Sequence, residues 1–106
     1  MKIQSNRLAN KSPHLKPGIV YEVIGLDWKM YKIIDEGNMP ALYPKKYFDV
    51  IDPTIPKEWI WTRFEDNIYY ADPPEFAEPG FFERWHDHEE SERKIFDEYL
   101  IKNNLK

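Results

Sequence analysis

The sequence predicts a mainly β, α+β fold in a single domain spanning residues 1–106, and three observations support this prediction. Runs rich in β-branched and aromatic residues recur along the chain, turn residues bound them, and helix-favouring residues fill the C-terminal end. A length of 106 residues suits one hydrophobic core. The predicted strands lie at 19–24, 28–34, 41–43, 50–51, 59–64 and 68–71, and the predicted helix lies at 88–103.

The first half of the chain divides into a polar N-terminal arm at 1–13 and a barrel-like core at 14–51. The arm is polar and is limited by a proline at its end, so we expect it to be loosely held, with 2–8 as a candidate edge strand. In the run at 28–34, Tyr31 and Ile33 share one face of the expected strand.

Two turns organise the rest of this core. The segment 35–38 has the composition of a tight reversal, because Asp, Gly and Asn accept positive backbone φ angles. Pro44 cannot donate to a strand ladder, and 45–48 then has room for one 3₁₀ turn before extended structure resumes.

The second half is predicted to be a hairpin at 58–71 followed by the helix. In the first run the two faces of the expected strand are formed by alternating residues, and a polar turn leads into the second run. Trp59, Trp61 and Arg63 alternate with Ile60, Thr62 and Phe64. Asp87 with Glu90 resembles a capping box at the helix start. The expected apolar stripe of the helix consists of Ile95, Phe96, Tyr99 and Leu100.

The segment 41–51 resembles the end of a Src-homology-3 domain, in which a strand leads to a proline, two polar residues, a tyrosine and a closing strand. The segment 16–24 is similar to the entry into that family's second strand. The chain thus resembles a bacterial Src-homology-3-like small barrel over about 14–51. The resemblance implies a groove for an extended peptide, lined by Pro44 and Tyr47, next to Tyr31.

The charge of the chain is unevenly distributed. The net charge is −4, yet residues 1–51 carry an excess of three positive charges and residues 52–106 an excess of seven negative ones. Between Glu65 and Glu92, ten carboxylates accompany one cation, Arg84. Such a field repels phosphate and attracts basic proteins. The same carboxylates can also serve solubility alone.

Enzymatic chemistry has no support in the sequence. There is no cysteine, the three serines and three histidines lie outside known nucleophile or metal motifs, and the four glycines are scattered. His86 and His88 would lie on opposite sides of a helix, so no metal or other cofactor is predicted. No apolar segment is long enough for a signal or membrane span, which favours a cytoplasmic location.

These observations predict a small non-enzymatic protein-binding module that uses the groove around Tyr31, Pro44 and Tyr47. The alternative is an immunity-type inhibitor whose acidic aromatic face at 65–92 neutralises a basic enzyme such as a nuclease toxin. Lysines beside the groove offer a basic patch, but the acidic second half disfavours nucleic acid as a partner. Oligomeric state stays open. The residues of the predicted acidic face are Glu65, Asp66, Glu83, Trp85, Glu89 and Glu90.

Overall fold

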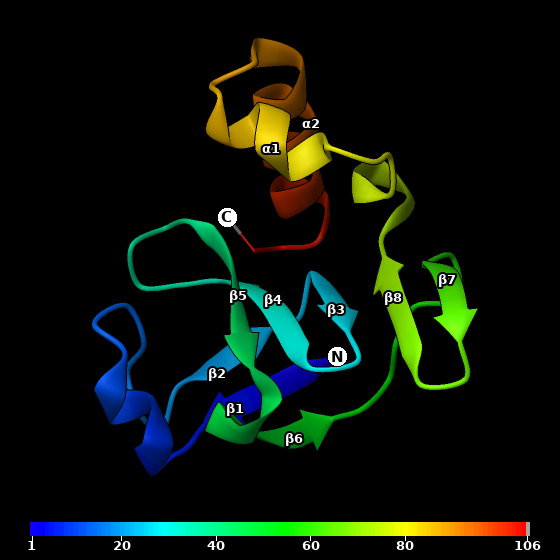
Figure 1. Cartoon of the computed structure of the whole chain (residues 1–106). Coiled ribbons are helices and arrows are strands. Elements are labelled where there is room, and N and C mark those ends of the chain that lie inside the picture. Colours follow the sequence, from blue (N-terminus) through cyan, green and yellow to red (C-terminus); the bar gives the residue numbers. More distant parts are fainter. Residues whose placement is uncertain (106) are drawn as a thin grey trace.

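A computed structural model of the chain, which describes residues 1–105, confirms the mainly β, α+β fold (Figure 1). Two antiparallel sheets form a small barrel-like body with strand orders β2-β1-β6 and β5-β4-β3-β8-β7. The strands are β1 (Lys2–Ser5), β2 (Val20–Glu22), β3 (Gly25–Asp27), β4 (Met30–Ile34), β5 (Pro40–Pro44), β6 (Phe48–Asp52), β7 (Ile60–Glu65) and β8 (Ile68–Asp72). The helices are the 3₁₀ turns η1 (Arg7–Lys11), η2 (Lys45–Tyr47) and η3 (Pro74–Phe76) and the α-helices α1 (Phe81–His86) and α2 (Glu90–Lys102).

The N-terminal segment is part of the barrel, which differs from the loosely held arm expected at 1–13. β1 is the central strand of its sheet, where Ile3 lies opposite Tyr21 on one side and Val50 on the other. Ile3 is fully buried, and the Ser5 hydroxyl accepts a hydrogen bond from the Ile19 amide at 3.1 Å. Alternate residues of this polar segment therefore face the core, which a count of polar residues does not reveal.

The strands predicted from 19 to 51 are present with adjusted ends. Only 20–22 of the run at 19–24 form a strand, β2, and β3 begins after the run, at Gly25. β4 alternates as expected, with Tyr31 and Ile33 buried. The turn before β5 contains Asn38 at a φ of 59°, and the Asp35 carboxylate accepts a hydrogen bond from the Gly37 amide at 2.9 Å. The 3₁₀ turn after Pro44 is η2.

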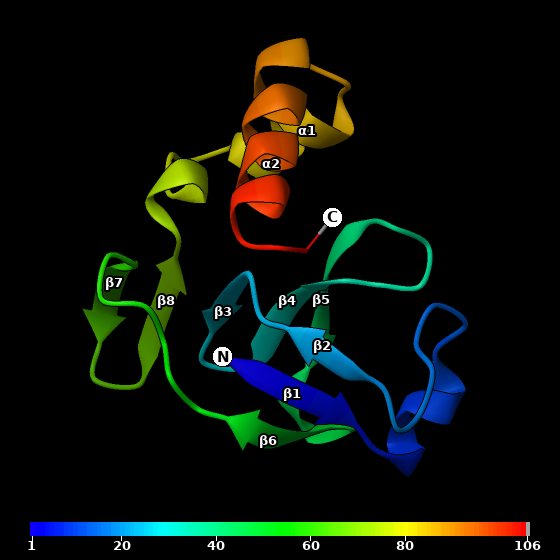
Figure 2. The same ribbon diagram turned by 180° about the vertical axis from the view of Figure 1, so that it is seen from behind.

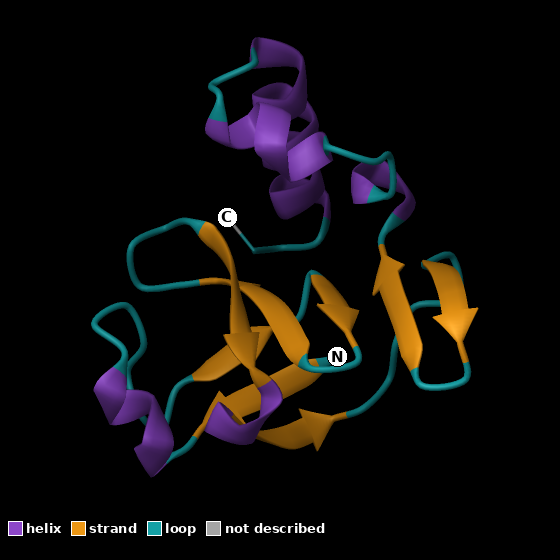
Figure 3. Ribbon diagram, in the orientation of Figure 1, coloured by secondary structure: helices purple, strands orange, loops and turns teal. Residues whose placement is uncertain are grey.

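The helical part covers one end of the barrel (Figures 2 and 3). It has its own core, which we call the helical core and which is linked to the barrel through Ile24. Phe76 is at its centre, with ring centroids 4.6–5.4 Å from four other aromatic rings. The buried members of the helical core are Ile24, Phe76, Phe81, Trp85, Phe96, Tyr99 and Leu100.

The helix expected at 88–103 is α2, and the capping box proposed for it is wrong. Asp87 instead caps the end of α1, the N-cap of α2 is Glu89 without a side-chain hydrogen bond, and His88 between the helices has a φ of 63°. Ile95 is 38% exposed, whereas Glu92 is buried in the stripe with Phe96. Burying a carboxylate in the stripe requires a partner, which α1 supplies.

Candidate interaction site on the β7–β8 hairpin

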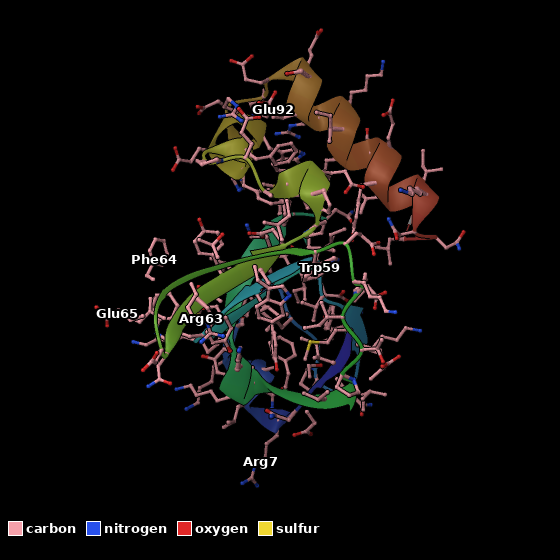
Figure 4. The ribbon with its side chains drawn as sticks, turned by 90° about the vertical axis from the view of Figure 1, so that its right-hand side faces the viewer. Arg7, Trp59, Arg63, Phe64, Glu65 and Glu92 are labelled. Carbon is pink, nitrogen blue, oxygen red and sulfur yellow. The ribbon has the colours of Figure 1, made fainter. Side chains whose placement is uncertain are left out.

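The β7–β8 hairpin extends the five-stranded sheet beyond the barrel. β8 pairs with β3, and β7 is the outermost strand of this sheet among the described residues. Five of the six residues of β7 are exposed, with Trp61 at 52% and Phe64 at 65%. In Figure 4, Phe64 lies at the outer margin of the hairpin, away from the barrel. Large apolar side chains that gather on an exposed edge are a frequent sign of an interface.

Aromatic side chains occupy both faces of this hairpin. On the face shared with the barrel core, Trp61 and Tyr69 have ring centroids 5.8 Å apart. On the opposite face, Phe64 lies 5.6 Å from Tyr70. Such cross-strand pairs hold the hairpin together and leave the outer parts of the rings in solvent. We call Ile60, Trp61, Arg63, Phe64 and Tyr69 the hairpin surface.

Cations connect this surface to the barrel. The Lys45 Nζ lies 5.2 Å from the Tyr31 ring centroid and 5.6 Å from that of Tyr69, and it donates a 3.4 Å hydrogen bond to the Tyr69 hydroxyl. The guanidinium of Arg63 lies 5.8 Å from the same Tyr69 centroid. Two cations therefore lie close to Tyr69, which favours partners with carboxylate or carbonyl groups.

The three residues of the predicted groove lie next to one another but differ in exposure. Tyr31 on β4 is only 7% exposed and packs edge-on against Phe48 in the barrel core. Pro44 ends the neighbouring strand, and Tyr47 on η2 packs partly against the same core. Burial raises the pKa of the Tyr31 hydroxyl, followed by a smaller effect of Tyr69. Most of the surface open to a ligand here belongs to Pro44 and Tyr47.

The residues of the predicted acidic face are separated by the length of β8. Glu65 and Asp66 lie at the hairpin turn, whereas Glu83 is on α1 and Glu89 and Glu90 are at the start of α2. Figures 1 and 2 both place the hairpin turn low on the molecule and the α1–α2 connection at its top. The carboxylates therefore form two separate groups.

Trp85, predicted as an anchor of that face, is 5% exposed and belongs to the helical core. The Arg93 guanidinium stacks 3.6 Å from its ring centroid, and the Arg93 Nε donates to the Trp85 carbonyl at 2.8 Å. This side chain joins α1 to α2, because its ring also packs against Phe96.

An ion pair between the two helices neutralises Glu92, one of the ten carboxylates counted between Glu65 and Glu92. The Arg84 Nε donates to Glu92, and its guanidinium lies 3.6 Å from Glu78. A hydrogen bond from Ser91 and the Arg84 contact hold the pKa of Glu92 below its ordinary value. Arg84, the one cation of this acidic stretch, thus fastens α2 to α1.

A cation–π contact between Lys32 and Phe82 joins the barrel to the helical part. The Lys32 ammonium lies 3.7 Å from the Phe82 ring centroid, and Asp72 is close enough to influence it. Burial lowers the pKa of Lys32 and raises that of Asp72. Lys32 thus contacts the helical part through Phe82.

Within residues 1–105, no group of three or more metal-binding side chains is close enough to hold an ion, and no helix is long and apolar enough to span a bilayer. His88 lies 3.0 Å from the Arg93 guanidinium. The sequence analysis selected none of the hairpin-surface residues as site residues, namely Ile60, Trp61, Arg63, Phe64 and Tyr69. Apolar residues on both sides of the 59–64 alternation were the available signal, since one buried face cannot hold them all.

The geometry defines the chain as a small β-rich protein with a barrel-like body, a helical cover and an exposed aromatic hairpin. Comparisons with family models, with curated proteins and with solved structures give no match for it.

Proposed function

We propose that this chain is a small non-enzymatic protein-binding module, and that its partner adds an extended strand to the free edge of β7. The observation that carries the proposal is the exposure of β7, an edge strand with Trp61 and Phe64 more than half exposed. An unpaired edge offers backbone donors and acceptors to an incoming strand, and side chains on its two faces provide selectivity.

The composition of β7 supports this use of the edge. Proteins usually protect such strands with lysine, proline or a bulge; β7 contains neither lysine nor proline, and its register shift lies near its end, between Arg63 and Glu65. Its charged residues, Arg63 and Glu65, leave the apolar side chains of the strand accessible. A partner strand rich in aromatic or β-branched residues with one carboxylate near Arg63 would complement it.

We further infer that the body is a Src-homology-3-like barrel. The central position of β1 between β2 and β6, and the 3₁₀ turn that separates β5 from β6, support this inference. The peptide groove of that family is the second candidate site here. Pro44 and Tyr47 are partly exposed beside Lys45, so Tyr47→Ala would abolish partner binding with little change in melting temperature if the groove is used.

The inhibitor hypothesis concerns the α1–α2 connection, where Glu83, Asp87, Glu89 and Glu90 are all exposed. A basic enzyme held there would associate more slowly as salt screens the carboxylates. Reversal of charge with Glu89→Lys plus Glu90→Lys would then lower the association rate at low salt. Hairpin binding depends on apolar and backbone contacts and would change little.

The test uses immobilised wild-type chain and a Trp61→Ala plus Phe64→Ala variant to capture partners from extract. The matched control is Ile51→Ala plus Ile101→Ala, which removes equally exposed apolar side chains elsewhere, at 53% and 62% exposure. We expect one partner to be retained by the wild type and the control and lost by the hairpin variant, with all three chains folded. A partner that binds the hairpin variant with unchanged affinity contradicts the proposal.

A further inference from the structure

An open cavity of about 490 Å³ lies where the barrel meets the C-terminal end of α2. Its walls come from the segments on either side of the hairpin, including Trp59 and Glu75, and from Tyr99 and Lys102 on the helix. In Figure 4, Trp59 lies between the strands and the helical part. The volume falls within the range of small-ligand sites, and the cavity is separate from the hairpin surface.

Tyr99 brings an unused polar group to this cavity. Its side chain is 8% exposed, and its hydroxyl makes no hydrogen bond to any other described residue. Burial, and then the charges of Glu75, Glu22 and Glu58, raise the pKa of this hydroxyl to about 12. Two of those carboxylates, Glu58 and Glu75, line the cavity together with Tyr99.

The charge at the cavity is not balanced by the chain itself. Glu58 and Glu75 line it, whereas Lys102 is its one cation and forms no ion pair with either among the described residues. Nearby, one buried carboxylate oxygen of Glu22 also lacks a hydrogen-bond partner within the described chain. Carboxylates gathered around largely buried aromatic rings favour a positively charged guest.

We propose that this cavity binds an organic cation, an alkylammonium or guanidinium group, between the Trp59 and Tyr99 rings and the carboxylates of Glu58 and Glu75. The apolar stem of the guest would lie against the proline rings at 56, 73 and 74. The Tyr99 hydroxyl would complete the polar contacts. The same chemistry is presented by a free amine and by a lysine or arginine side chain of a protein.

The test is an NMR titration of the isotope-labelled full chain with butylammonium, butylguanidinium and, as an anion of similar size, butyrate. We expect the Trp59 indole and Tyr99 resonances to shift saturably with both cations, at millimolar concentrations, and not with butyrate. Equal shifts with butyrate, or no saturable shift with either cation, overturn the proposal.

Charge variants test whether the guest that binds in the cavity is positively charged. Glu58→Gln plus Glu75→Gln should weaken cation binding by about tenfold, whereas Lys102→Gln should strengthen it, because the guest no longer competes with an internal ammonium. Glu98→Gln on the exposed side of α2 is the matched control and should leave affinity unchanged. Tyr99→Phe should weaken binding while the chain stays folded. Weaker binding by Lys102→Gln contradicts the proposed charge of the guest.

Competition with peptides shows whether the natural guest is a free amine or a protein side chain. A capped peptide with one lysine or arginine that competes with butylammonium for the same resonances assigns the cavity to a protein side chain, and competition by the free amines alone assigns it to a small molecule. Both results support a cation site, and failure of both series removes it. The Trp61→Ala plus Phe64→Ala variant should bind the cations normally, so this test is independent of the hairpin proposal.

Discussion

Replacement of Phe76 by alanine tests whether the helical cover is a packed part of the fold. Phe76 is 3% exposed, and four aromatic rings surround it. Removal of a buried phenylalanine costs about 3–5 kcal/mol, and lost ring pairs place this one toward the upper end. This is a large part of the roughly 5–15 kcal/mol that stabilises a domain.

Phe64→Ala is the same chemical change at a residue that is 65% exposed and in contact with Tyr70. It should cost no more than about 1 kcal/mol. Urea unfolding followed by tryptophan fluorescence measures both values, with Phe76→Leu as a milder variant if the alanine variant does not fold. A Phe76→Ala loss below about 1 kcal/mol, or a Phe64→Ala loss above about 2 kcal/mol, refutes the assignment of core and surface.

Three further predictions concern the barrel and its tyrosines. Ile3→Ala should destabilise the chain by about 2–5 kcal/mol in urea unfolding, because Ile3 is fully buried on the central strand of its sheet. A value near zero would instead support the loosely held arm that the sequence predicts at 1–13. Gly25→Ala should change stability by no more than about 1 kcal/mol in the same assay, since its Cβ would lie 2.8 Å from the Asp72 carboxylate, the end of a side chain that can shift; a loss of about 3 kcal/mol or more would contradict this. Burial is the main cause that raises the pKa of Tyr43 and of Tyr99 to about 12, whereas the pKa in the unfolded chain is about 10. Because the folded chain holds these two protons more tightly, the stability they contribute is complete below pH 10 and should be lost as the pH rises toward 12. A Tyr43→Phe plus Tyr99→Phe variant should lose less in alkaline unfolding than the wild type does, and an equal loss contradicts these shifts.

The strands, the 3₁₀ turn and the hairpin were predictable because their signals are local. Alternation, proline and turn residues determine where such elements begin and end, and β4 with its buried Tyr31 and Ile33 follows its sequence pattern closely. The central position of β1 was not predictable in this way. Only Ile3 and Ser5 face inward there, and their burial depends on pairing with β2 and β6, which are distant in the sequence.

The sequence could not tell which aromatic residues belong to the surface. Trp61 and Trp85 both stand among aromatic and charged residues in the sequence. In the structure Trp61 lies on an edge strand, whereas Trp85 lies between two helices. Gly80, at a φ of 81°, is the N-cap of α1, a helix that the sequence analysis did not predict. That extra helix places Trp85 in the core and supplies Arg84 to the buried Glu92.

Hydrogen exchange on the chain with and without its captured partner tests the central claim most directly. If a partner strand pairs with β7, exchange of the backbone amides at 60–65 should slow markedly, because amides at a free edge become hydrogen-bonded. Amides of β6, at 48–52, serve as the internal reference. Protection confined to 44–47 or to 83–90, with exchange at 60–65 unchanged, would contradict binding at the hairpin and assign the partner to the groove or to the acidic α1–α2 connection.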